Sequence, residues 1–300
     1  MVGAVRSELT HLDGPTHLLD FGGEGPPMVL VHGLGGNALN WMRVGHALAR
    51  HHRVYALDLV GFGRTPLGGR ASTVPGHSSL VERFVERLGE PATLVGNSMG
   101  GMVSLDLASR RPELVRRLVL VDPAIPRYDR APLDRAVVAA FSAYAVPGVG
   151  EAWLRRVGRE VPPEKLLAYF MDLCGVDARA LPRDVYDSHI ELGLYRRGLP
   201  WNDAAFLSSA RSLLRRILVR PRWESIARGV RAPTLLMHGE RDRLVSVVSA
   251  RGLARRKAHW RFAELSGVGH TPMLEVPERF AEVTLDFTAG AADSGLRASP

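Results

Sequence analysis

The chain of 300 residues has little cysteine, little lysine and no long apolar stretch, and each absence excludes a class of protein or site. Cys174 is its only cysteine, so an intrachain disulfide is impossible, which fits a reducing compartment. No uncharged apolar stretch reaches the ~20 residues that a membrane-spanning helix needs. Residues 1–15 carry charged side chains and lack the apolar centre of a secretory signal. We therefore expect a cytoplasmic protein without a membrane span.

Lysine is nearly absent as well. Lys165 and Lys257 are the only two, so arginine supplies almost all the positive charge behind the formal net charge of +8. A basic surface can attract polyanions, but these arginines are scattered along the chain and no nucleic-acid-binding motif accompanies them. We therefore expect a small-molecule substrate and no nucleic-acid partner, and the oligomeric state stays open.

Short apolar runs alternate with longer helical patterns, which is typical of an α/β protein with a parallel sheet. The runs are almost continuously apolar, as strands buried on both faces must be. We predict strands at 28–31, 53–57, 92–95, 118–121, 234–237 and 260–263. Apolar residues at helical spacing predict helices at 79–88, 99–110 and 277–287.

This alternation stops between residues 126 and 229, where prolines separate helix-like segments. We interpret residues 126–229 as an inserted, mostly helical module. The α/β core then comprises residues 1–125 and 230–290. The last ten residues, 291–300, are small and polar, and we predict that they form a disordered tail.

A Gly-X-Ser-X-Gly motif lies between a predicted strand and a predicted helix, with Ser98 at its centre. The chain must turn sharply there, and the small residues Gly96 and Gly100 leave room for the turn. The hydroxyl of Ser98 would then project from the bend. The amide of Met99 lies at the start of the helix, where free N–H groups and a partial positive charge suit a developing oxyanion.

A serine needs a base to become a nucleophile, and His270 is the best candidate among the histidines. It lies in a glycine-rich loop after the sixth predicted strand. Asp242 follows the fifth strand and could hold the imidazole in the productive tautomer. Asp122, at the end of the fourth strand, is the alternative acid. Either aspartate could instead be an ordinary turn or capping residue.

Taken together, these motifs resemble the α/β-hydrolase superfamily, in particular its capped, cofactor-free serine hydrolase branch. The resemblance covers residues 16–125 and 230–287, and includes the Asp58–Thr65 and Gly269–Glu275 loops. It implies an α/β-hydrolase fold with a mostly parallel, eight-stranded sheet flanked by helices. The inserted module would be a helical cap, with the substrate pocket between cap and core. It also implies an acyl-enzyme mechanism without metal or cofactor.

The resemblance adds an oxyanion hole. The His32–Gly36 loop follows the first predicted strand, where the family places its second oxyanion donor. The backbone amides of Leu34 and Met99 would converge on one oxygen. We expect the side chain of His32 to hold this loop rather than to carry a proton. The segment lacks the spacing of a phosphate-binding loop.

The predicted activity is hydrolysis of carboxylic esters with small to medium, largely apolar groups. One alternative is carbon–carbon bond hydrolysis of ring-fission products, because those enzymes share Gly-Asn-Ser-Met-Gly-Gly; they usually carry tryptophan where this chain has Thr271. Further alternatives are perhydrolase or haloperoxidase-like chemistry and a ligand receptor with slow turnover. The related dehalogenases and epoxide hydrolases use aspartate in place of Ser98.

Overall fold

The computed structural model describes residues 4–128 and 134–290. Within these residues eight strands form one sheet in the order β1-β2-β4-β3-β5-β6-β7-β8. The first two strands pair antiparallel with each other, β2 pairs antiparallel with β4, and every later pairing is parallel. The prediction of a mostly parallel α/β-hydrolase sheet is therefore confirmed. The strands are β1 (Arg6–His11), β2 (Pro15–Gly22), β3 (Pro27–Val31), β4 (Arg53–Leu57), β5 (Ala92–Asn97), β6 (Val115–Val121), β7 (Thr234–Gly239) and β8 (Arg261–Leu265).

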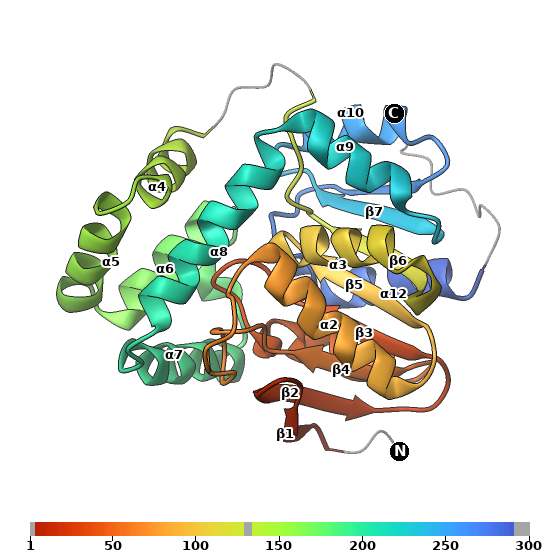
Figure 1. Ribbon diagram of the computed structural model, residues 1–300, viewed down its shortest axis with the longest axis horizontal. Helices are drawn as coiled ribbons and strands as arrows, with labels where there is room; N and C mark the ends of the chain where they lie inside the picture. Colours follow the sequence, from red (N-terminus) through yellow and green to blue (C-terminus); the bar gives the residue numbers. More distant parts are fainter. Residues whose placement is uncertain (1–3, 129–133, 291–300) are drawn as a thin grey trace.

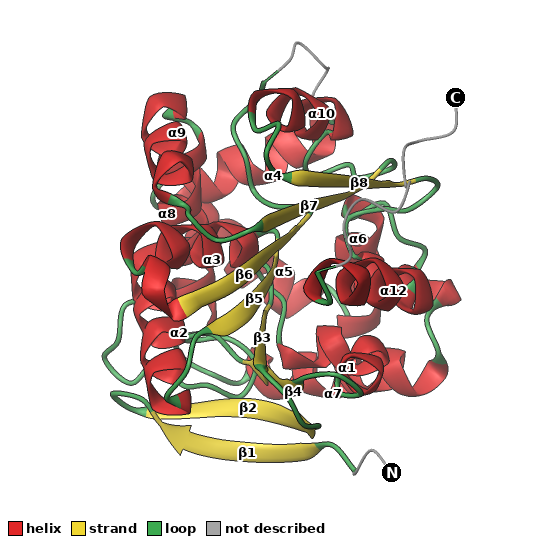
Figure 2. Ribbon diagram, turned by 90° about the vertical axis from the view of Figure 1, so that its right-hand side faces the viewer, coloured by secondary structure: helices red, strands yellow, loops and turns green. Residues whose placement is uncertain are grey.

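Helices cover both faces of this sheet, as the view along it shows (Figure 2). Alternate residues of the central strands face opposite layers: Val29 and Val31 belong to one apolar cluster, while Met28 and Leu30 belong to the other. The helices that follow the core strands are α1 (Met42–Leu48), α2 (Val74–Leu88), α3 (Met99–Arg110), α10 (Val247–Arg256), α11 (Pro272–Glu275) and α12 (Pro277–Thr288).

The described part of the segment between β6 and β7 consists mainly of helices. It contains α4 (Arg135–Ala145), α5 (Val149–Glu160), α6 (Pro163–Leu173), α7 (Arg183–Arg197), α8 (Asn202–Ile217) and α9 (Arg220–Gly229). Figure 1 shows α4 to α8 gathered beside one end of the sheet. The last helix, α9, instead packs against α3, with Trp223 and Ala227 buried in the apolar cluster of that layer.

The elements differ from the prediction most clearly at the edge of the sheet and at the start of α2. Strands β1 and β2 match no apolar run in the sequence, because β1 is exposed along most of its length and β2 carries polar residues among its buried ones. Helix α2 begins at Val74, five residues before the predicted start, since Thr73 caps it and Pro75 stands in its first turn. The predicted disordered tail, residues 291–300, lies outside the described residues.

Among the described residues no single helix has the length and apolarity needed to cross a membrane. Helices α4 and α5 meet the criterion only as a pair, by length and composition, and are bent by 113° where they join.

Candidate active site

Ser98 lies between β5 and α3 in a backbone conformation that few side chains tolerate. Its φ is 54° and its ψ is −116°, which places a non-glycine residue at positive φ. Such strain persists only where the surroundings enforce it, and it clusters at functional sites. A Cβ on Gly100 would lie 2.1 Å from the carbonyl oxygen of Val31, and a Cβ on Gly96 would lie 2.4 Å from the carbonyl oxygen of Gly100. The two glycines therefore allow the tight turn that the motif predicted.

The two other predicted members of the site are directly bonded. The Nδ1 atom of His270 lies 2.7 Å from Oδ2 of Asp242, and both side chains are buried. The other carboxylate oxygen of Asp242 accepts the backbone N–H groups of Leu244 and Val245 at 2.8 and 3.0 Å. These bonds hold the carboxylate in place, with Oδ2 directed toward the imidazole of His270.

The serine turn and the histidine loop are joined by Asn97, the residue before Ser98. Its side-chain amide donates to the carbonyl oxygen of His270 at 3.0 Å and to that of Val121 at 3.2 Å. The backbone N–H of His270 donates to the carbonyl oxygen of Cys174 at 2.8 Å. Sequence reasoning did not assign a role to Asn97, although it stands inside the quoted Gly-X-Ser-X-Gly motif.

The second imidazole nitrogen of His270, Nε2, is available to accept a proton. Nε2 is buried and has no hydrogen-bond partner among the described residues, so the Ser98 hydroxyl is not bonded to it in this state. In enzymes without bound substrate such bonds are often long and tighten only in the complex. Placement next to the Ser98 turn, with Nδ1 held by Asp242, leaves Nε2 as the nitrogen that could accept a proton.

Asp122, the alternative acid, is part of the same buried cluster but makes a different contact. Its Oδ1 accepts the backbone N–H of Gly239 at 2.7 Å, while its Oδ2 is buried without a hydrogen-bond partner among the described residues. Its φ of 45° also marks a constrained position. The direct bond to His270 belongs to Asp242, so the geometry favours Asp242 over Asp122 as the supporting acid.

His238, near the end of β7, is a member of this cluster that the sequence did not single out. Its Nε2 lies 2.8 Å from the carbonyl oxygen of Val245, 3.3 Å from Oδ2 of Asp242 and 3.7 Å from Oδ1 of Asp122. It stands four residues before Asp242, but only the turn after β7 brings the two side chains together. In the sequence His238 is only a histidine near the end of a predicted strand, and such residues are too common to indicate a function.

Burial and charge act against each other on the pKa values here. Burial favours the neutral forms, but the neighbouring imidazoles outweigh it at Asp242 and hold the pKa of that carboxyl well below its usual range. Burial also opposes the charged form of His270, yet the carboxylates of Asp242 and Asp122 raise its pKa above the ordinary value. Burial raises the pKa of Asp122. The site is therefore built to stabilise an imidazolium at His270.

The same cluster contains the best set of metal-ligand atoms among the described residues. Single ligand atoms of Asp122, Asp242 and His270 lie within 4.8 Å of one another. Two of these three side chains are already bonded to each other, because Nδ1 of His270 lies 2.7 Å from Oδ2 of Asp242. An ion bound there would compete with the hydrogen bond that orients the imidazole.

The two predicted oxyanion donors both have unused amides. Neither the N–H of Leu34 nor that of Met99 donates a hydrogen bond to another of the described residues. The loop that carries Leu34 lies against the serine, since a Cβ on Gly33 would come 3.0 Å from Cβ of Ser98. His32 holds this loop: its Nε2 accepts the N–H of Leu59 at 3.0 Å, and its Nδ1 lies 2.7 Å from the carbonyl oxygen of Gly33. Burial lowers the pKa of His32 to about 4, so the ring stays neutral.

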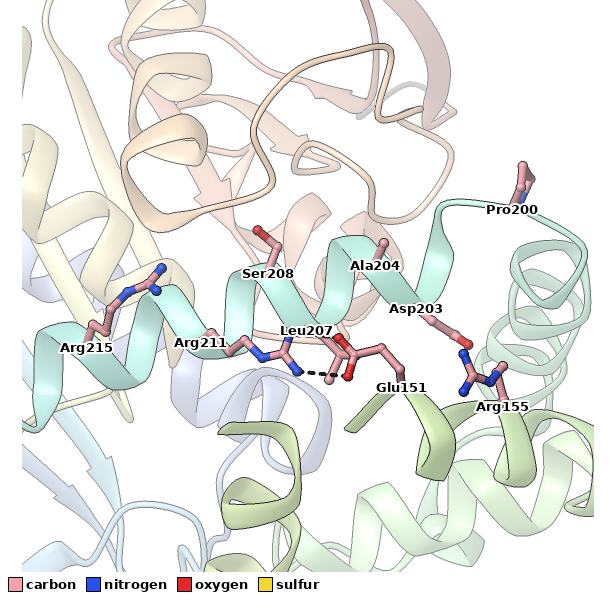
Figure 3. A pocket seen from close by; sticks show the side chains of 9 residues that line it. All are labelled: Glu151, Arg155, Pro200, Asp203, Ala204, Leu207, Ser208, Arg211 and Arg215. Atoms are coloured by element: carbon pink, nitrogen blue, oxygen red, sulfur yellow. Dashed lines mark hydrogen bonds and ion pairs between the residues drawn. The ribbon is translucent and has the colours of Figure 1, made fainter. Parts of the chain in front are cut away.

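A separate cavity of about 550 Å³ opens between α5 and α8 (Figure 3). Its lining includes Glu151 and Arg211, which form an ion pair with 2.8 and 3.0 Å contacts. None of the candidate catalytic residues lines it. Further along α8, Arg216 pairs with Asp106 of α3 at 2.8 Å.

Comparison with known proteins identifies the family of the chain. A model of the alpha/beta hydrolase family matches residues 28–283. The chain belongs to the alpha/beta hydrolase family. Family membership and its relatives together support a hydrolase activity.

Two curated relatives span almost the whole chain. The pimeloyl-[acyl-carrier protein] methyl ester esterase of Aeromonas hydrophila subsp. hydrophila is 27% identical over 269 residues, which cover 88% of this chain and 96% of the esterase. The 2-hydroxy-6-oxo-2,4-heptadienoate hydrolase of Pseudomonas putida is 32% identical over 290 residues, which cover 91% of this chain and 92% of that hydrolase. Among solved structures, a serine hydrolase involved in carbazole degradation has a TM-score of 0.69 and 25% identity, covering 95% of this chain and 99% of its own.

Proposed function

We propose that this protein hydrolyses carboxylic esters through an acyl-enzyme, with Ser98 as nucleophile, His270 as base and Asp242 as the supporting acid. The observation that carries the proposal is the buried 2.7 Å bond between His270 and Asp242, on a loop that Asn97 ties to the strained serine turn. This arrangement leaves Nε2 of His270 as the only ring nitrogen that can accept the serine proton.

The proposed reaction begins when the Ser98 oxygen attacks the acyl carbon while His270 takes its proton. The amides of Leu34 and Met99 hold the oxyanion, and loss of one such donor typically lowers the rate by roughly 10²–10³. His270 then gives its proton to the departing alkoxide, and the alcohol leaves. Water, activated by the same imidazole, attacks the acyl-enzyme and releases the acid. Asp242 stabilises the imidazolium at both stages.

The methyl ester esterases among the relatives support the ester reaction. A dienoate hydrolase, 32% identical over most of the chain, favours a second candidate, which is hydrolysis of a carbon–carbon bond in a ring-fission product. Thr271, where those enzymes usually carry tryptophan, argues for the ester. We propose that residues 126–229 form the cap, that substrate binds between cap and core, and that the protein acts in the cytoplasm.

Three measurements test the proposal. A panel of nitrophenyl esters of increasing acyl length and a ring-fission dienoate should give turnover of the esters and little of the dienoate. Ser98→Ala should reduce ester turnover by at least about 10³-fold. A matched control, Ser188→Ala on an exposed helix face, should leave it unchanged. Brief labelling of the wild type with a fluorophosphonate should place the adduct on the peptide that contains Ser98. Full activity of Ser98→Ala would refute the proposal, and faster turnover of the dienoate would replace the ester by the carbon–carbon reaction.

A further inference from the structure

A second Ser-His-Asp chain of hydrogen bonds lies on the antiparallel edge of the sheet. Nε2 of His17, on β2, lies 2.8 Å from the hydroxyl of Ser7, on β1. Nδ1 of the same ring lies 2.6 Å from Oδ2 of Asp58. Strands β1 and β2 stand at the edge of the molecule in Figure 1, apart from the helices α4 to α8. Ser7 is exposed, whereas His17 and Asp58 are buried.

The contacts of Asp58 determine how protons are arranged along this chain. Burial alone would raise the pKa of Asp58, but hydrogen bonds from His17 and from the Arg64 amide, with the nearby His32, lower it. An ionised carboxylate only accepts hydrogen bonds, so Nδ1 of His17 is the donor. In the neutral ring Nε2 then carries the lone pair, and the Ser7 hydroxyl donates to it. This is the arrangement in which an imidazole can act as base toward a serine.

Backbone hydrogen bonds hold both Asp58 and His17 in place. The other carboxylate oxygen of Asp58 accepts the N–H of Ala38 at 2.7 Å, and its Oδ2 also accepts the N–H of Arg64 at 2.8 Å. The N–H of His17 donates to the hydroxyl of Thr65 at 2.9 Å. Asp58 therefore holds the imidazole of His17 through Nδ1, as Asp242 holds that of His270, and the hydrogen bond between His17 and the serine is already formed.

We propose that Ser7 is a second nucleophilic serine, which becomes covalently modified by activated phosphonyl or acyl electrophiles with His17 as the base. With a fluorophosphonate, the Ser7 oxygen forms a bond to phosphorus, the phosphorus–fluorine bond breaks, and fluoride leaves. The serine proton passes to Nε2 of His17 and from there to water. Ser7 lies within a strand, whereas Ser98 stands at the N-terminus of α3, so we expect the modification of Ser7 to be stoichiometric and slower than that of Ser98.

The test uses the full-length Ser98→Ala protein, so that the first site cannot react. The protein is incubated with excess fluorophosphonate, and adducts are counted by intact mass and located by peptide mapping. We expect one adduct, on the peptide containing Ser7. It should be absent from Ser98→Ala/Ser7→Ala, and its rate should fall about 10²-fold in Ser98→Ala/His17→Gln, the loss typical for removal of a general base.

Ser188 provides the matched comparison, because it is exposed and its hydroxyl donates to the carbonyl oxygen of Asp184. The ring of the adjacent His189 bonds to Val185 and Asn40 rather than to this serine. Ser188 should stay unmodified. An unmodified Ser7, or equal rates at Ser7 and Ser188, would overturn the proposal, and so would an unchanged rate in a folded His17→Gln variant. The comparison of the two serines within one protein decides the matter even if His17→Gln does not fold. Since the assay reads the position of an adduct without Ser98, its failure would leave the proposed esterase function untouched.

Discussion

Replacing each of the two buried aspartates by asparagine should separate the acid that orients His270 from the one that does not. In Asp242→Asn, the amide oxygen would stay with the N–H groups of Leu244 and Val245, which donate to Oδ1 of the native side chain. The amide nitrogen would then face Nδ1 of His270 across the 2.7 Å contact. Two donors cannot share that contact, so the imidazole would move its proton to Nε2 and lose its ability to accept one from Ser98.

The same exchange in a serine protease triad lowers kcat by about 10⁴. We expect kcat/KM for a nitrophenyl ester to fall by about 10³- to 10⁴-fold in Asp242→Asn, or about 4 to 5.5 kcal/mol of transition-state stabilisation. Asp122→Asn keeps an oxygen for the N–H of Gly239 and touches no atom of the His270–Asp242 bond. Its kcat/KM should stay within about tenfold of the wild type, since only a neighbouring charge is lost.

Steady-state kinetics across a pH range would measure both variants, with urea unfolding as the control for folding. The acid limb of the Asp122→Asn profile should move to lower pH, because the Asp122 carboxylate raises the pKa of His270. Reversed magnitudes, with Asp122→Asn the more damaging, would assign the supporting role to Asp122. Near-normal activity of Asp242→Asn would refute the tautomer argument itself.

Three further variants probe other parts of the molecule. His238→Gln should move the acid limb of kcat/KM to higher pH, because the His238 ring lowers the pKa of His270; an unmoved limb would mean that His238 carries no charge. Gly96→Ala should lower the free energy of unfolding in urea by at least about 2 kcal/mol, as its Cβ would meet backbone at 2.4 Å; normal stability would contradict the close approach. Arg216→Ala should lower the free energy of unfolding by about 1.5 kcal/mol, since it removes one of the two arginines that pair with the buried Asp106 and leaves Arg110 in place. The exposed Arg215→Ala should change stability by less than about 0.5 kcal/mol. Equal effects of the two arginine substitutions would show that the buried pair does not stabilise the fold.

The central strands could be predicted because parallel strands buried on both faces leave uninterrupted apolar runs. The run at 92–95 and the one at 118–121 both fall within observed strands. The edge hairpin left no such run, because β1 is packed on one side only and most of its side chains are exposed. The pairing of β1 with β2 arises only in the folded chain, and so does the contact between Ser7 and His17. No pattern of residues along the sequence predicts either one.

The choice between Asp242 and Asp122 shows where sequence reasoning stopped. Both follow neighbouring parallel strands, β7 and β6, so both end at the same edge of the sheet and either could reach the histidine loop. The turn after β7 decides between them by directing one carboxylate to Nδ1 of His270. His238 escaped notice for the same reason, since its importance comes from the folding of that turn rather than from any pattern of residues.

The position of α9 limits which of the helices between β6 and β7 can be removed or replaced. Since Leu118 of β6 pairs with Thr234 of β7, the chain that leaves β6 after Val121 must run back about 10 Å before it can re-enter the sheet. Helix α9 makes this return crossover while shielding α3 with Trp223. A shortened protein, or a chimera with other helices in place of α4 to α8, should therefore be cut after Ile125 and rejoined ahead of Arg220, so that α9 remains packed against α3.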